Sequence, residues 1–268
     1  MNTKLIVSGC LGKMGRDISK IAFMDSELEL IAGVESLNSS DIGSDLGSLV
    51  LGEGRDIPIT AELKDYIADT DVVIDFSSPR ATLNNLKVVS EYGKSIVVGT
   101  TGFNDSELKE VEDASKEAAI LISPNMSVGI NVLFKIIPQL TQLLGNDYDV
   151  EIVEAHHNQK KDAPSGTAKR IAELIKRVRE DLVFNYGREG SDVKREKNEL
   201  AIHALRLGEV VGEHKVIFAG NNEIIELSHS AISRNIFTKG AILGAKYIKG
   251  KKAGLYTMQD VLSAKLSG

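Results

Sequence analysis

The sequence predicts an α/β protein of two domains, a parallel-sheet domain and an α+β domain whose sheet is mostly antiparallel. Three observations support this prediction. Short apolar, β-branched runs alternate with helical stretches from residue 1 to about 127. Beyond that point, strand-like runs follow one another through short Gly and Asn turns. The length of 268 residues also fits two modest domains of about 150 residues or less.

The first domain is predicted over residues 1–127, completed by residues 235–268. Its strands are near-continuous apolar runs, which is typical of a parallel sheet covered by helices on both faces. The expected strands are 4–8, 28–34, 72–76, 95–98 and 119–122. The expected helices are 14–24, 61–68, 80–92 and 105–118.

The second domain is predicted over residues 128–234. Ser127 is a suitable N-cap for a helix through Leu144, and apolar residues on nearly all sides predict that this helix is buried. Residues 178–198 are charged and contain glycine, which predicts a mobile excursion. The other expected elements are a strand at 149–154, a helix at 165–177, strands at 200–205, 214–219 and 223–229, the last two joined through Gly220-Asn221-Asn222, and an apolar helix at 232–248.

Composition excludes several classes of function. With 32 Lys and Arg against 38 Asp and Glu, the net charge of −6 lacks the positive excess that general binding to nucleic acid or to an anionic membrane requires. No window of about 18 residues is both uncharged and apolar, and Lys4 leads directly into a strand, so we expect no membrane span, no signal peptide and a cytoplasmic location. The single Cys10 excludes an internal disulfide and a cysteine-based zinc site.

The turn after the first strand has the composition of a dinucleotide-phosphate site. Gly9, Gly12 and Gly15 stand between an apolar strand and an amphipathic helix, spaced G-x-x-G-x-x-G instead of the stricter G-x-G-x-x-G. Glycines there allow a tight turn and a close approach of pyrophosphate to the N–H groups of the helix. Glu35 follows the second strand, 20 residues after Gly15, where a carboxylate can accept hydrogen bonds from an adenosine ribose. These features predict a Rossmann-type domain.

The choice of coenzyme depends on residues beside this turn. Glu35 would repel a 2′-phosphate and Ser36 offers no guanidinium, which favours NAD. Lys13 and Arg16 also lie beside the turn, and one of them could reach a 2′-phosphate. We therefore expect either NADH or NADPH to serve as cofactor.

The densest polar cluster of the chain is the segment 151–168, EIVEAHHNQKKDAPSGTA, which follows a strand and opens a helix. It supplies proton donors, fixed positive charge and the N–H groups of a helix start within a few residues. A purely structural role would not explain this concentration of charge. His156 and His157 are adjacent, so they diverge on extended backbone, and no further ligands follow at usual spacings. We therefore expect no metal.

These motifs resemble the dihydrodipicolinate reductase family, also called 4-hydroxy-tetrahydrodipicolinate reductases, over nearly the whole chain. The resemblance implies reduction of 4-hydroxy-tetrahydrodipicolinate, a dicarboxylate, to tetrahydrodipicolinate with hydride from NADH or NADPH, in diaminopimelate and lysine biosynthesis. The matching motifs are GCLGKMG at 9–15, Asp75-Phe76-Ser77, GTTG at 99–102, PNMSVG at 124–129, the segment 151–168 and Ser233-Arg234.

The resemblance also implies roles for single residues. His156 falls on the catalytic acid/base position and Lys160 on the catalytic lysine. The substrate-binding positions are Thr101, His157, Lys160, Ser165, Gly166 and Thr167. The cofactor-binding positions are Gly9, Leu11, Gly12, Lys13, Met14, Gly15, Glu35, Phe76, Ser77, Gly99, Thr100, Thr101, Asn125, Met126 and Arg234. This chain departs from relatives at Asn158-Gln159, where more basic residues are common, and at Ser36, where some have arginine. The departures bear on substrate affinity and on NADP preference.

Three other functions fit the sequence less well. A semialdehyde dehydrogenase needs a catalytic thiol, and Cys10, the only thiol, lies in the nucleotide turn. Ketone reduction of the homoserine dehydrogenase type is compatible with the domain organisation, but the chain does not match the motifs of such enzymes. An NADH-sensing regulator would need a DNA-binding or partner module, and the chain has no basic helix-turn-helix segment.

The second domain also predicts an assembly. Val216 and Phe218 alternate with Ile217 and Ala219, so both faces of the sheet carry apolar residues, and a monomer would expose one of them. The resembled family forms tetramers through this domain. We therefore expect a homotetramer of closed symmetry, with hinges near Ser127 and Arg234.

Overall fold

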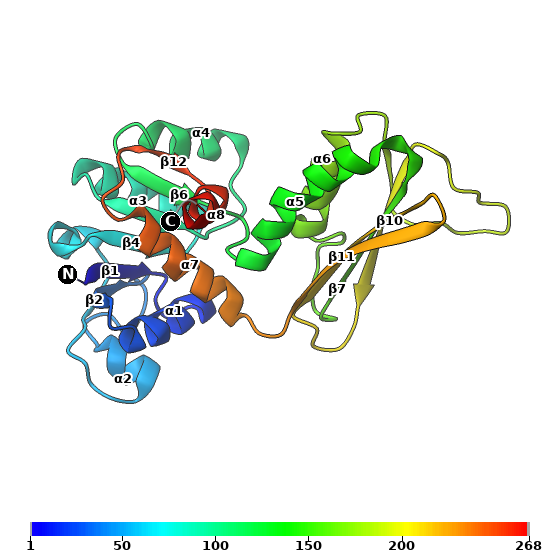
Figure 1. Cartoon of the computed structure of the whole chain (residues 1–268). Helices are drawn as coiled ribbons and strands as arrows, with labels where there is room; N and C mark the ends of the chain where they lie inside the picture. Colours follow the sequence, from blue (N-terminus) through cyan, green and yellow to red (C-terminus); the bar gives the residue numbers. More distant parts are fainter. Residues whose placement is uncertain (1, 267–268) are drawn as a thin grey trace. The chain divides into compact units, whose positions relative to one another are not determined.

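The computed structural model describes residues 2–266. The chain divides into two compact units, each with its own sheet and core (Figure 1). The first unit runs up to Val128 and resumes at Asn235, and the second spans Gly129–Arg234.

The first unit is built on a seven-stranded parallel sheet in the order β12-β6-β5-β4-β1-β2-β3. All five strands expected from apolar runs are present, with ends shifted by at most one residue. The two short edge strands, β3 and β12, were not predicted because two or three residues carry no periodicity. The strands are β1 (Thr3–Ser8), β2 (Leu28–Val34), β3 (Ile59–Thr60), β4 (Val72–Asp75), β5 (Ser95–Val98), β6 (Ala119–Ile122) and β12 (Gly254–Tyr256).

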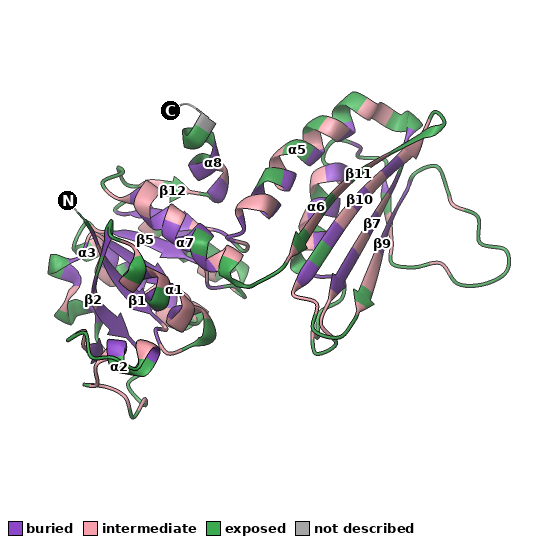
Figure 2. Ribbon diagram, turned by 60° about the horizontal axis from the view of Figure 1, so that its bottom comes forward, coloured by how far each residue is buried: buried purple, intermediate pink, exposed green. Residues whose placement is uncertain are grey.

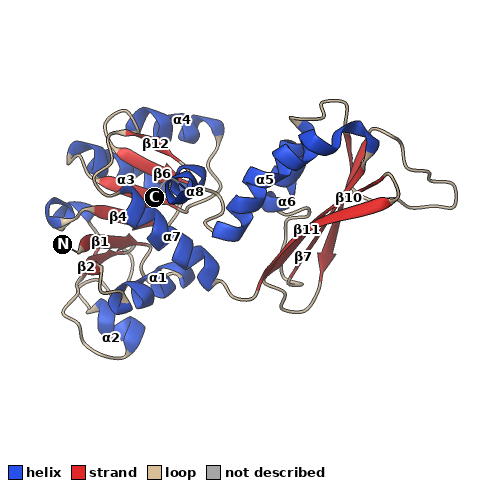
Figure 3. Cartoon of the chain, viewed as in Figure 1, coloured by secondary structure: helices blue, strands red, loops and turns tan. Residues whose placement is uncertain are grey.

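Helices cover both faces of this sheet, as its apolar strands predicted (Figure 3). Leu5 and Val7 of β1 pack in one core with residues of α1 (Lys13–Met24), α7 (Asn235–Ile248) and α8 (Met258–Leu266). Ile6 lies in the other core, with α3 (Pro79–Glu91) and α4 (Asp105–Ala114). Alternate residues of each strand thus enter opposite cores, and the sheet is buried between them (Figure 2).

One local prediction in the first unit was wrong, and one short helix was not predicted. The helix expected at 61–68 is a pair of 3₁₀ turns, η1 (Leu63–Asp65) and η2 (Ile67–Asp69), separated by Tyr66 in a non-helical conformation. Leu63 and Ile67 are both buried, and their four-residue spacing is the same as that of buried residues on one face of a helix. A short helix, α2 (Leu46–Leu51), was missed although Asp45 caps its first turn and Gly52, at φ 80°, ends it.

The second unit has a five-stranded sheet in the order β11-β10-β7-β9-β8. The two longest ladders, β10 with β11 and β10 with β7, are antiparallel, whereas β7 with β9 and β9 with β8 are parallel. Asn221 and Asn222 join β10 to β11 with φ of 51° and 63°, the backbone of a two-residue type I′ hairpin. The strands are β7 (Asp149–His156), β8 (Val183–Asn185), β9 (Glu199–Arg206), β10 (Gly212–Gly220) and β11 (Glu223–Ala231).

Helices α5 (Val128–Leu144) and α6 (Gly166–Lys176) pack on one face of this sheet, around Val150, Ile152 and Phe218. The prediction that α5 is buried on nearly all sides was wrong, because it contacts the core along one stripe and exposes Val132, Ile136 and Leu143. Among the described residues, one helical stretch, Val128–Asp147, is long and apolar enough to cross a membrane by length and composition alone. A core helix passes the same test.

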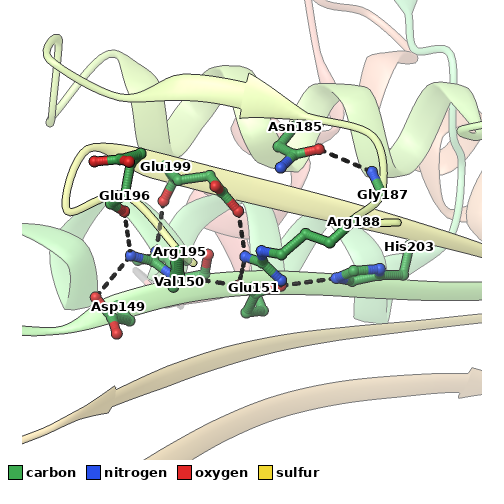
Figure 4. A network of polar contacts seen from close by, with 10 residues as sticks. All are labelled: Asp149, Val150, Glu151, Asn185, Gly187, Arg188, Arg195, Glu196, Glu199 and His203. Carbon is green, nitrogen blue, oxygen red and sulfur yellow. Dashed lines mark hydrogen bonds and ion pairs between the residues drawn. The ribbon is translucent and has the colours of Figure 1, made fainter. Parts of the chain in front are cut away.

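The segment 178–198, expected to be a mobile excursion, is tied to the sheet. It contains β8, which pairs with β9. Figure 4 shows two of its arginines bonded to strand residues: Arg188 to Glu151 (Nη2–Oε1 2.5 Å) and to Glu199, and Arg195 to Asp149 (Nη1–Oδ1 2.8 Å). Two of the charges that suggested a solvated loop are thus bonded to strand residues, whereas Glu189, Asp192 and Lys194 between them are exposed.

Candidate active site

The glycine turn of the first unit leaves no room for side chains at two of its three glycines. Gly9 has φ of 71°, and a Cβ there would lie 2.5 Å from the carbonyl oxygen of Phe76. A Cβ on Gly15 would lie 2.0 Å from the carbonyl oxygen of Gly9. The glycines at these positions therefore allow a turn in which backbone segments are in direct contact.

The start of α1 fits an anionic group such as a pyrophosphate. Its N-cap is Gly12, no side chain caps the first turn, and no acidic residue lies in that turn. The first N–H groups of a twelve-residue helix, Lys13 and Met14 among them, are therefore not covered by a capping side chain.

Glu35 lies against this turn, as its position after β2 predicted. Its Oε2 accepts a hydrogen bond from the N–H of Leu11 at 3.0 Å, and its Oε1 accepts one from the N–H of Ser36 at 2.9 Å. Arg16 is engaged elsewhere, because its guanidinium donates to the carbonyl oxygens of Leu11 (2.9 Å) and Leu49 (2.8 Å). Of the two cations proposed for a 2′-phosphate, exposed Lys13 is the better candidate.

The other predicted cofactor residues of this unit follow the neighbouring parallel strands. Phe76 and Ser77 follow β4, Gly99, Thr100 and Thr101 follow β5, and Asn125 and Met126 follow β6. The sheet order changes direction between β1 and β4, and open α/β sheets bind ligands at the carboxyl ends of strands beside such a switch. The structure thus brings these residues to one edge of the sheet.

Buried Asp75 ties these strand ends together and was not assigned a role from the sequence. Its Oδ1 accepts hydrogen bonds from the N–H and hydroxyl of Ser77 (3.0 and 2.6 Å) and from the hydroxyl of Thr100 (3.2 Å). Its Oδ2 accepts from Asn85, which also donates to the hydroxyl of Ser8. Burial raises the pKa of Asp75 above its ordinary value, and these hydrogen bonds offset only part of that rise. One carboxylate therefore holds the ends of β1, β4 and β5.

A second polar cluster, in the second unit, surrounds the carboxylate of Glu154 on β7. Glu154 is fully buried and lies 2.5 Å (Oε2) from Nδ1 of His156, two residues along the same face of the strand. Arg206 of β9 donates to both carboxylate oxygens, at 2.9 and 3.1 Å, and the N–H of Ser165 donates to Oε1 at 3.1 Å. Burial would raise the pKa of Glu154, but the bonds from His156, Arg206 and Ser165 outweigh it and hold the pKa at about 2.

The His156 ring also has close neighbours on β10. The ring of His214 stands edge-on to it with centroids 5.2 Å apart, and His214 Nε2 lies 3.1 Å from the hydroxyl of Ser165. Burial, and then the nearby His156, lower the pKa of His214 to about 3, so His214 is neutral at physiological pH. A Cβ on Gly212 would lie 3.1 Å from Nε2 of His156, so glycine at this position keeps space beside that nitrogen.

Two groups suited to carboxylates lie on the loop after β7. Lys160 Nζ pairs with Asp162 at 2.8 Å, and this pairing lowers the pKa of Asp162. Helix α6 starts with Gly166 and Thr167, is capped by the Ser165 hydroxyl, and has no acidic residue in its first turn. The structure therefore brings His156, Lys160 and the helix start around one loop, with His157 on the loop between them. Arg234 is exposed and immediately precedes α7.

The sequence reasoning missed four residues of this cluster, Glu154, Arg206, Gly212 and His214. Glu154 had a local signal, because alternate strand residues share a face and Glu154 precedes His156 by two. No local pattern in the sequence indicated Arg206, because only the pairing of β7 with β9 places it opposite His156. Within residues 2–266, no three His, Cys, Asp or Glu side chains are arranged to hold a metal ion.

Comparison with known proteins gives full-length matches. Residues 3–126 match the family model for the dihydrodipicolinate reductase N-terminus, and residues 129–262 match that for its C-terminus. The chain is 44% identical over 267 residues to the 4-hydroxy-tetrahydrodipicolinate reductase of Aquifex aeolicus, covering 98% of this chain and 99% of that protein. It is 45% identical over 267 residues to that of Methanocaldococcus jannaschii, covering 97% of each.

A solved structure gives the same fold. The dipicolinate-bound dihydrodipicolinate reductase from Paenisporosarcina sp. TG-14 superposes with a TM-score of 0.77 at 23% identity, covering 97% of this chain and 99% of that one. At that identity the likeness shows the fold alone.

Proposed function

The chain belongs to the dihydrodipicolinate reductase family, and from this premise we propose how its own residues carry out the reaction. The activity is the NAD(P)H-dependent reduction of 4-hydroxy-tetrahydrodipicolinate in lysine biosynthesis. The match to reductases of this kind over the full length favours this activity over ketone reduction of the homoserine dehydrogenase type. We assign nucleotide binding to the first unit, and substrate binding and oligomerisation to the second.

The first unit would hold the nucleotide at the glycine turn and along the neighbouring strand ends. The uncapped start of α1 suits the pyrophosphate, and Glu35 suits the ribose hydroxyls next to Leu11. Phe76 and Thr100 belong to loops that Asp75 holds in place. When bound, the reduced nicotinamide supplies the hydride.

The observation that carries the proposed chemistry is the contact of His156 with buried Glu154. Addition of hydride to an unsaturated ring builds negative charge that a proton must quench, and an imidazole titrates in the physiological range. We assign the proton donor to His156, with Nε2 beside the space that Gly212 leaves.

Two anion sites would orient the dicarboxylate. The start of α6, at Ser165, Gly166 and Thr167, offers N–H groups and the positive end of a helix dipole. Lys160 offers a mobile cation, and a substrate carboxylate would take the place of its present partner, Asp162. His157 completes the proposed substrate contacts within the second unit.

We expect pyridine-2,6-dicarboxylate to inhibit competitively against the substrate, because it presents two carboxylates on a planar ring. A relative of the same fold is described as dipicolinate-bound. Replacing Thr167 with valine should weaken this inhibition by about 1 to 3 kcal/mol, through loss of a charge-assisted hydrogen bond. Initial rates at varied substrate and NADH give the inhibition pattern. Competition with NADH alone would place the dicarboxylate site elsewhere.

We expect NADH to serve at least as well as NADPH, measured as kcat/KM. Glu35 repels a 2′-phosphate, Ser36 cannot neutralise it, and Arg16 is bonded to two carbonyl oxygens. An assay coupled to dihydrodipicolinate synthase, following the absorbance of NADH and NADPH in parallel, measures both values and tests the activity itself. A hundredfold preference for NADPH would contradict the charge argument and direct attention to Lys13.

We also propose a cytoplasmic homotetramer assembled through the open face of the second sheet. Ile217 and Ala219 are only partly buried on that face, and Ile224 of β11 is exposed. Light scattering at micromolar concentration should report about four times the chain mass of 29.0 kDa. A monodisperse, active monomer would refute the interface.

A further inference from the structure

We propose that Glu154, held by Arg206, is the positioning residue that selects which nitrogen of His156 carries the transferable proton and fixes the loop that receives the substrate. The proposal rests on the proposed role of His156 as proton donor. It concerns a carboxylate and a guanidinium to which the sequence reasoning gave no role.

The contact of Glu154 with His156 selects one tautomer of the ring. An ionised carboxylate only accepts hydrogen bonds, so at 2.5 Å from Glu154 Oε2 the Nδ1 of His156 must carry a proton. In its neutral form, His156 then has an unprotonated Nε2. Nε2 is therefore the nitrogen that gains and gives up the proton, and it is also the nitrogen next to Gly212.

The proton balance follows from this tautomer. Once the 4-hydroxyl group of the substrate has left as water, doubly protonated His156 gives the proton on Nε2 to the unsaturated ring, which accepts the hydride in a new C–H bond. The ring returns to its neutral form with Nδ1–H still bonded to Glu154. Glu154 stays ionised throughout, and a proton from solvent restores the imidazolium. The carboxylate thus orients the ring and stabilises its charged form without taking the proton itself.

Arg206 keeps the carboxylate in place. Its two terminal nitrogens donate to the two oxygens of Glu154, and such a bidentate pair fixes both the position and the plane of the carboxylate. With His156 on Oε2 and the Ser165 N–H on Oε1, each oxygen accepts two hydrogen bonds. A fully buried carboxylate needs these partners to stay charged.

The same pair fixes the substrate loop relative to His156. Glu154 holds the N–H of Ser165, the N-cap of α6, and Arg206 donates to the carbonyl oxygen of Asp162 at 2.6 Å. Asp162 is the partner of Lys160. The ion pair of Glu154 and Arg206 therefore holds three parts of the site: the proton donor, the start of α6, and the loop that carries Lys160.

The chain supplies a matched control on the same strand. Glu151 also contacts a histidine, His203 (2.7 Å), and an arginine, Arg188 (2.5 Å), but on the open face of the sheet. Replacing Glu151 with glutamine removes a carboxylate with the same kinds of partner and leaves His156 untouched. Because Glu151 lies on the face proposed for assembly, light scattering of this variant accompanies its kinetics.

The experiment compares Glu154→Gln, Glu154→Asp and Glu151→Gln with the wild type. Glutamine keeps the size of Glu154 but can donate to Nδ1, which favours the Nε2–H tautomer. Aspartate keeps the charge for Arg206 but is too short to reach His156 in the same way. We expect both Glu154 variants to lower kcat by about 10- to 100-fold, with a smaller change in KM, and Glu151→Gln to keep the wild-type kcat.

Nitrogen-15 NMR of the histidine rings tests the tautomer in the wild type, independently of whether any variant folds. The chain has five histidines, and the His156 signal is assigned by its loss in His156→Gln. Neutral His156 is expected to carry its proton on Nδ1 in the wild type and on Nε2 in Glu154→Gln. A wild-type proton on Nε2 would overturn the proposal. So would near-normal kcat in both Glu154 variants when His156→Ala is impaired, and that result would leave the proposed function standing. Normal turnover by His156→Ala would instead refute the proposed proton donor.

Discussion

Replacing His156 or Lys160 with alanine is expected to lower kcat by about 10² to 10⁴, the range for loss of a general acid or a charge-stabilising group. Without His156, the charge left by hydride addition must be quenched by a proton from water. Without Lys160, a substrate carboxylate loses its cation, so KM should rise as well. Steady-state rates with the synthase-coupled substrate measure both constants.

Binding of NADH should stay near that of the wild type in both variants, because neither residue belongs to the first unit. Lys161→Ala is the matched control for Lys160: the neighbouring lysine is exposed, and its removal changes net charge equally. Near-normal turnover in His156→Ala or Lys160→Ala would remove that residue from the mechanism, and an equal loss in Lys161→Ala would show a general charge effect.

Replacing Gly15 with alanine is expected to weaken NADH binding by about 10² or more, equivalent to about 2.7 kcal/mol. In most helices, alanine in place of glycine stabilises by about 1 kcal/mol. Here the added Cβ would lie 2.0 Å from the Gly9 carbonyl oxygen and 2.7 Å from the Cα of Cys10, so the turn itself must move. The free energy of unfolding should also fall by about 1 to 3 kcal/mol. Fluorescence titration with NADH and thermal unfolding measure the two effects.

Gly244→Ala is the control for this substitution. Gly244 lies within α7 of the same unit, and a Cβ there would meet only side chains, the nearest being Leu121 Cδ1 at 3.3 Å. Its NADH affinity should match that of the wild type. Wild-type NADH binding by Gly15→Ala would show that the glycine turn does not shape the nucleotide site.

The order of strands and helices in the first unit could be predicted well, because each element is marked by a pattern within a short stretch of sequence. Buried parallel strands are continuous apolar runs, and the turns between them carry the glycines and hydroxyl residues that ligand-binding edges need. The failures were also local in origin. The 3₁₀ turns around Tyr66 share the spacing of buried residues found in helices, and α5 is apolar beyond the stripe that contacts its core.

The sequence by itself determined the two kinds of sheet, the glycine turn and the segment that carries His156, Lys160 and the start of α6. These features lie within short stretches of chain, where spacing and residue type are sufficient. Only the tertiary structure decided how that chemistry is held. Glu154 and Arg206 are 52 residues apart, and they meet because β7 pairs with β9. A buried carboxylate is stable only when such distant partners surround it, and no local pattern in the sequence records that contact.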